Sequence, residues 1–124
     1  MEKDEFQEQL NHAQDLMSEE KFSDALKLLE RLKDIEQKMD FDYNLTHKFF
    51  QLLSNCKSLY NQQIILKSLN KAKSQNILSI TFQELKDLLK DELALEVSIL
   101  GREVELLILR GVLSCKLEGN KIIF

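Results

Sequence analysis

Apolar residues recur at intervals of three and four positions near the start of the chain, as they do on one face of an α-helix. Phe6, Leu10, Ala13 and Met17 form such a stripe and predict a helix over residues 3–18. After a short polar break, a second stripe predicts a helix over residues 22–39. Because the break is short, we expect the two helices to form an antiparallel hairpin.

The following apolar stripes predict two further helices. Asp42 is placed to cap the third helix, because its carboxylate can accept hydrogen bonds from unpaired amides at the helix start. That helix runs to Cys56, and a fourth begins at Ser58 or Asn61. We therefore predict one helical bundle over residues 1–76, made of two antiparallel helical hairpins.

The pattern changes in the segment that follows. Residues 77–80 are rich in β-branched and leucine side chains and predict a short strand. Thr81 and Glu84 have the spacing of a capping box and predict the start of a helix over residues 82–90. The leucines that we expect this helix to face inward are Leu85, Leu88 and Leu89.

The last part of the chain predicts a long helix and a hairpin. Helical spacing holds over residues 96–110, and Gly111 stands where a helix commonly ends. Two apolar runs then flank a turn that contains Gly119, which is typical of a β-hairpin. The order strand, helix, helix, hairpin predicts a winged-helix module over residues 77–124. The whole chain is thus expected to be mostly α with a small β-hairpin or sheet.

A short sheet leaves an edge strand whose backbone groups can pair with another protein. We expect the strand over residues 121–124 to be this edge. Alternation along the strand places Ile123 on the face opposite to Ile122 and Phe124, which could also close the module's own core. The predicted partner-binding residues are Leu113, Cys115, Leu117, Lys121, Ile122, Ile123 and Phe124.

Composition and charge narrow the function classes. Of all residues, 44% are hydrophobic and 31% are charged, as in a folded globular protein. The net charge is −4, and residues 1–40 carry 12 acidic and 6 basic side chains, a net of −6. This acidity disfavours nucleic acid as the main partner. No apolar run is long enough to span a membrane, and the first residues lack the apolar core of a signal peptide. We expect an intracellular protein, cytoplasmic or nuclear, that does not engage membranes.

The chain offers little chemistry for catalysis. His12 and His47 have no neighbours at metal-ligand spacing, so we expect no metal. The candidates for catalysis that involve no histidine are also weak. The side chains of Glu103 and Glu105 point in different directions on their helix, so they cannot share a proton. The sequence contains no glycine-rich phosphate loop. Cys56 and Cys115 stand in apolar surroundings and are expected to be reduced core residues. We predict a protein that is not an enzyme and binds no cofactor or small-molecule substrate.

The order and spacing of the last third resemble the C-terminal winged helix of PCI domains. The resemblance is carried by Ile80-Thr81-Phe82, Leu93-Ala94-Leu95, the helix that ends at Gly111, and the strands at residues 112–117 and 122–124. PCI domains are scaffold modules of the signalosome, the proteasome lid and translation initiation factor three. The resemblance implies helical repeats before the winged helix, assembly through its sheet, and PCI-containing subunits as partners. Gly101 departs from the family, which often has a glutamate there.

Two alternatives stay open. A winged helix can bind DNA, but the helix over residues 96–110 and the hairpin turn carry few basic side chains for phosphate contacts. Residues 25–72 also resemble the helical partner-binding domain at the N-terminus of transcription elongation factor S.

The first two helices are similar to one tetratricopeptide-like repeat, with Ala13, Phe22 and Ala25 at the close contacts. An ordinary helical hairpin explains the same pattern.

Overall fold

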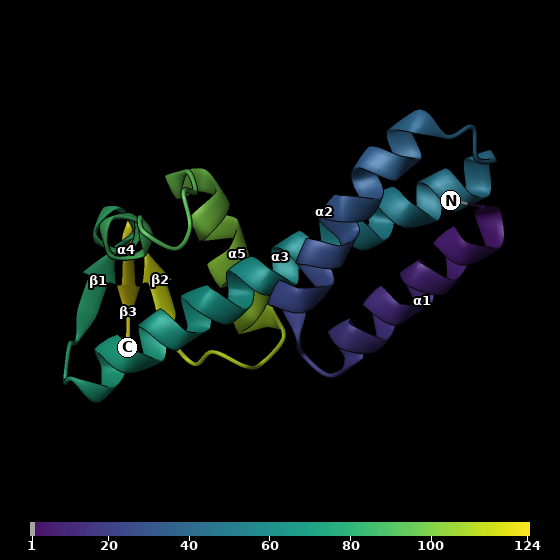
Figure 1. Ribbon diagram of the computed structural model, residues 1–124. Coiled ribbons are helices and arrows are strands. Elements are labelled where there is room, and N and C mark those ends of the chain that lie inside the picture. Colours follow the sequence, from purple (N-terminus) through teal and green to yellow (C-terminus); the bar gives the residue numbers. More distant parts are fainter. Residues whose placement is uncertain (1) are drawn as a thin grey trace. The chain divides into compact units, whose positions relative to one another are not determined.

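The computed structural model describes residues 2–124, which form five α-helices and one three-stranded antiparallel sheet (Figure 1). The prediction of a mostly helical chain with a small sheet is confirmed. In chain order, the elements are α1 (Lys3–Ser18), α2 (Phe22–Lys38), α3 (Tyr43–Ser74), β1 (Ser79–Thr81), α4 (Phe82–Leu89), α5 (Val97–Leu109), β2 (Lys116–Glu118) and β3 (Lys121–Ile123). Residues 2–60 and Asn61–Phe124 form two compact units, which we call the N-terminal and the C-terminal unit.

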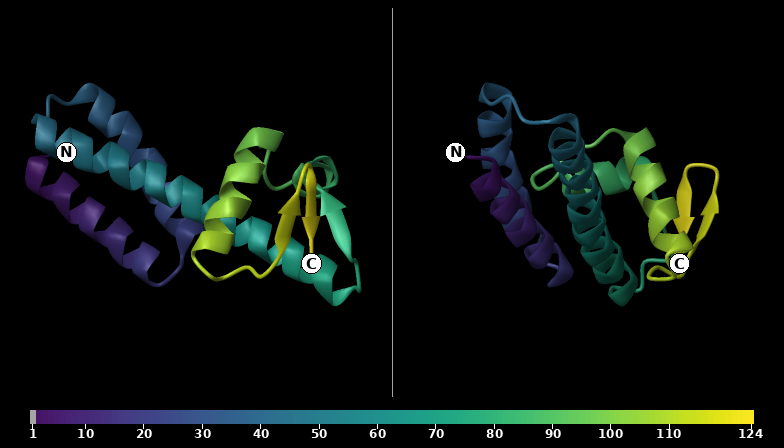
Figure 2. Two further views of the ribbon diagram at one scale, coloured as in Figure 1. Left: turned by 180° about the vertical axis from the view of Figure 1, so that it is seen from behind. Right: turned by 90° about the vertical axis from the view of Figure 1, so that its right-hand side faces the viewer.

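The N-terminal unit contains α1, α2 and the first part of α3. Phe6 and Ala13 of α1 are fully buried, as are Ala25 and Leu29 of α2. The ring of Phe6 also packs on that of Phe41, with 4.5 Å between their centroids. Both helices predicted in this part of the chain are confirmed, and they lie side by side (Figure 2).

The helix α3 is continuous over 32 residues, so the predicted third and fourth helices are one helix and the second helical hairpin is wrong. Its start is as predicted, because the Leu45 N–H donates to Asp42 Oδ1 at 2.9 Å. The stretch contains neither glycine nor proline, the residues that most readily end a helix. Nothing in the sequence therefore interrupts the helix near Ser58 or Asn61.

The apolar stripe of α3 changes side along the helix, which is why the sequence pattern suggested a break. The buried apolar residues of its first part are Leu45, Phe49, Leu52, Leu53 and Cys56. Those of its second part are Ile65, Leu69 and Ala72. With about 100° between successive residues, the two sets lie on different sides of the helix. The compact units accordingly divide between Tyr60 and Asn61, within α3, whereas the sequence suggested a boundary after residue 76.

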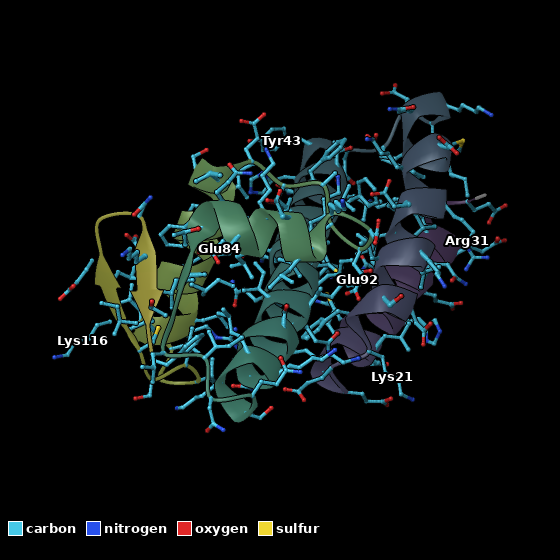
Figure 3. All side chains as sticks on the ribbon, turned by 90° about the vertical axis from the view of Figure 1, so that its left-hand side faces the viewer. Lys21, Arg31, Tyr43, Glu84, Glu92 and Lys116 are labelled. Carbon is cyan, nitrogen blue, oxygen red and sulfur yellow. The ribbon has the colours of Figure 1, made fainter. Side chains whose placement is uncertain are left out.

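The predicted start of α4 and the predicted end of α5 are both confirmed in the C-terminal unit. The Glu84 N–H donates to Thr81 Oγ1 at 3.0 Å, and the Thr81 N–H donates to Glu84 Oε1 at 3.1 Å, which completes the predicted capping box of α4. Figure 3 shows Glu84 at this helix start. Gly111 follows α5 with a φ of +76°, a left-handed conformation that favours glycine after a helix. The inward orientation expected of Leu88 is wrong, because its side chain is 60% exposed.

The three strands have the order β1-β3-β2, so the last strand is central (Figures 1 and 2). In the register, Ile122 stands opposite Ile80 on one side and Leu117 on the other. The expectation that residues 121–124 form an edge is therefore wrong. Pairing of β3 with β2 follows from the hairpin turn, but pairing with β1 joins residues far apart in the chain, which local sequence does not specify. The edges belong to β1 and β2.

Candidate protein-interaction surface

The outer edge of β2 is the first feature of the candidate surface. In the described residues β2 pairs only with β3, so alternate backbone N–H and C=O groups of β2 point away from the sheet. Lys116 and Glu118 are exposed, and Leu117 between them is half-buried. Figure 3 shows Lys116 projecting from this strand. A free strand edge of this kind can accept an extended segment of another protein.

An apolar groove of about 310 Å³ lies beside this edge, between the end of α5 and β2. We call it the α5–β2 groove. Its lining residues are Glu105, Ile108, Leu109, Cys115 and Leu117. Leu109 is the last residue of α5 and is 81% exposed, although it is a large apolar side chain. In general, a strand edge beside an apolar groove can pair with the backbone of an extended segment and accommodate one of its side chains.

The structure divides the predicted partner-binding residues into three sets. Cys115 and Leu117 line the α5–β2 groove, as a surface role requires. Leu113 and Ile122 are buried, at 6% and 0% exposure, and belong to the core of the C-terminal unit. The remaining three are Lys121, which is exposed, and Ile123 and Phe124, which are half-buried. Leu109 was not predicted from the sequence. The feature that could have identified it is its position in the last turn of α5, two residues before Gly111.

A buried polar contact joins α3 to α5 and was also missed. Glu103 is 1% exposed and Gln62 is 4% exposed. The Gln62 Nε2 donates to Glu103 Oε2 at 3.0 Å, and Arg102 Nη2 lies 3.4 Å from Glu103 Oε1. Arg110 Nη1 in turn donates to Gln62 Oε1. Burying a carboxylate is unfavourable unless it is hydrogen-bonded, so this contact explains how Glu103 can occupy the inner face of α5.

That contact could have been anticipated from helical spacing. Glu103 stands three residues after Leu100 and four before Leu107, both of which are buried. It therefore lies in the apolar stripe of α5, whereas its neighbour Glu105 is exposed. A charged residue inside such a stripe predicts a buried partner, and Gln62 is that partner.

The two thiols differ in their surroundings. Cys56 is fully buried, and its Sγ lies 3.6 Å from the Phe22 carbonyl oxygen. Burial raises the pKa of the Cys56 thiol. Burial also raises the pKa of the Cys115 thiol, and the positive charge of Lys73 opposes that rise. Raised pKa values keep both thiols protonated near neutral pH, which makes them poor nucleophiles.

Both histidines belong to the N-terminal unit. His47 stacks on Tyr43 with 5.8 Å between ring centroids, and His12 borders a shallow groove in the N-terminal unit. In residues 2–124, no group of three or more His, Cys, Asp or Glu side chains is placed to hold a metal ion. None of the helices in the described range is both long and apolar enough to cross a bilayer.

Comparison with protein-family models, with curated proteins and with solved structures gives no match for this chain. The candidate surface is therefore defined by its own geometry: the free edge of β2, the adjoining apolar groove, and the exposed Leu109 at the end of α5.

Proposed function

We propose that the protein is a non-catalytic assembly subunit of a multiprotein complex, of the kind built from PCI domains. In this proposal it acts inside the cell, and the C-terminal unit is a winged helix that binds a neighbouring subunit. The α1–α2 pair serves as a short helical repeat of tetratricopeptide type. The signalosome, initiation factor three and the proteasome lid are the complexes that the sequence resemblance suggests.

The order of elements in the C-terminal unit supports the winged-helix part of the proposal. The chain runs β1-α4-α5-β2-β3, and the last strand lies between the other two. A winged helix has this order, with two helices between the first strand and a closing hairpin. The second half of α3 provides the additional helix that precedes the first strand in that fold.

The single observation that carries the proposed binding role is the free edge of β2 beside the α5–β2 groove. Adding a partner strand to β2 would satisfy its outward backbone groups, and an apolar side chain of the partner would cover Leu109 and Leu117. Since β3 is central, the sheet assembles through β2 in this proposal, rather than through the last strand.

The test compares two leucines that are equally exposed. Leu109 and Leu78 are each 81% exposed, but only Leu109 lines the α5–β2 groove. Tagged wild-type protein, Leu109→Glu and Leu78→Glu would each be purified from native cells, and their partners identified by mass spectrometry. We expect wild type and Leu78→Glu to retain the same PCI-containing subunits, and Leu109→Glu to lose them. Equal recovery with Leu109→Glu, or partners without PCI domains, would refute the proposal.

A DNA-binding assay separates the proposal from a role in transcription. The exposed side of α5 presents Arg102, Glu105 and Leu109, so it offers little positive charge to phosphates. We expect no sequence-selective binding of duplex DNA at about 150 mM salt, measured by fluorescence anisotropy. A selective complex with sub-micromolar affinity would favour the DNA-binding alternative.

A further inference from the structure

A second groove, of about 410 Å³, lies within the C-terminal unit between the second half of α3 and the end of α4. We call it the α3–α4 groove. Its apolar lining includes Ile64, Ile77 and Leu88, and the α5–β2 groove shares no lining residue with it. Leu88 is 60% exposed and Ile77 is 39% exposed, so apolar surface lies open to solvent here. Clustered apolar exposure of this kind marks binding surfaces.

The wall of the α3–α4 groove that α3 provides is positively charged. Lys67 and Lys71 stand four residues apart, so their side chains project from the same side of the helix. Both are exposed, and no carboxylate of the described residues lies within ion-pair distance of either. The carboxylate that lines the groove, Glu92, comes after α4. The two lysines are therefore available to a ligand's acidic groups.

We propose that the α3–α4 groove binds an amphipathic helix of a partner protein whose apolar face is flanked by acidic side chains. The apolar residues of that helix would cover Ile77 and Leu88, and its carboxylates would face Lys67 and Lys71. The α3 wall extends from Ile64 to Gln75, which is about three helical turns and matches a short helical segment. This binding mode, a helix laid in an apolar groove, is common in protein recognition.

The α3–α4 groove shares no lining residue with the α5–β2 groove, so binding of a helix here and assembly through β2 can each be refuted without the other. The probe is a synthetic fluorescent peptide of about 15 residues, with leucines spaced to form one helical face and glutamates beside them. One control peptide replaces the glutamates by lysines, and another has the same composition with the leucines scattered around the helix. Binding to the full chain would be measured by anisotropy, and the binding site located by amide chemical shifts.

The matched protein variants are charge reversals on α3. Lys67→Glu with Lys71→Glu alters the groove, whereas Lys73→Glu reverses a lysine of the same helix that does not line it. All three lysines are exposed, so folding should persist, as circular dichroism would verify. We expect the double reversal to weaken binding of the acidic peptide by about tenfold or more, because two attractions become repulsions. Leu88→Ser should weaken it without changing its salt dependence.

Support requires that the acidic amphipathic peptide binds more tightly than both controls, and that shifts appear at residues lining the α3–α4 groove. Binding should also weaken as salt is raised, because the attraction is between exposed charges. Equal binding of the lysine peptide, an unchanged affinity in the double reversal, no binding of the acidic peptide, or shifts centred on Leu109 and Leu117 would each overturn the proposal.

Discussion

The buried contact between Gln62 and Glu103 allows a quantitative test. Replacing Gln62 by leucine keeps a side chain of similar size but removes the Nε2 donor that lies 3.0 Å from Glu103 Oε2. Because Glu103 is only 1% exposed, water cannot easily replace that donor. A hydrogen bond to a charged group contributes roughly 1.5–3 kcal/mol, and losing a donor costs more where the charge is buried. We expect Gln62→Leu to lower the free energy of unfolding by about 2–4 kcal/mol.

The double variant Gln62→Leu, Glu103→Leu distinguishes this reasoning from simple loss of packing. It replaces the polar pair by an apolar pair and leaves no buried charge. We therefore expect it to be more stable than Gln62→Leu alone, with a coupling between the two sites of at least about 1 kcal/mol. If the losses of unfolding free energy in the single variants Gln62→Leu and Glu103→Leu add up to the loss in the double variant, the two side chains do not stabilise the protein through their contact.

The assay is urea unfolding followed by circular dichroism, with the free energy taken from the linear extrapolation. Glu105→Gln serves as the control, because Glu105 lies on the same helix but is exposed. A substitution there should change stability by less than about 0.5 kcal/mol. An unfolding midpoint of Gln62→Leu equal to that of wild type would refute the assigned role of the contact.

Three further predictions follow from the C-terminal unit and the thiols. Leu107 is 1% exposed, so Leu107→Ala should cost about 2–5 kcal/mol in urea unfolding, and an unchanged midpoint would contradict its burial. Hydrogen bonds from the Thr81 backbone and side chain lower the pKa of Glu84. The cap therefore stabilises the fold at pH values above the unfolded-state pKa of Glu84, and this stabilisation is lost as the pH falls through its folded-state pKa. Thr81→Ala should raise the pKa of Glu84, as measured by an NMR titration. Cys115 is half-exposed and Cys56 is buried, so a maleimide should label Cys115 in the folded protein and Cys56 only after unfolding; equal rates would contradict this difference.

The sequence predicts those parts of the fold that depend on neighbouring residues. The capping box of Thr81 and Glu84, the cap at Asp42 and the helix stop at Gly111 each act within a few positions, and all three are confirmed. The spacing of apolar residues likewise predicts α1, α2 and α5. Each of these features is set by chain geometry that does not depend on the rest of the molecule.

What the sequence could not provide depends on residues far apart. The pairing of β1 with β3 joins Ser79 to Ile123 and places the last strand in the centre, so the expected edge moves to β2. The continuity of α3 was hidden by a change of its buried side, because periodicity alone cannot distinguish two helices from one helix that packs on two sides. Of the predicted partner-binding residues, Cys115 and Leu117 line the α5–β2 groove, whereas Leu113 and Ile122 are buried.

The charges of β2 have a consequence for how the protein behaves in concentrated solution. Its residues are Lys116, Leu117 and Glu118, so two copies aligned antiparallel about Leu117 would bring each lysine opposite a glutamate. In a parallel alignment, like charges would meet and repel. The edge is thus complementary to itself in one orientation, and self-association would compete with a partner as concentration rises. Affinities at this edge should be measured at several protein concentrations, and sedimentation velocity should be used to determine the oligomeric state at each concentration.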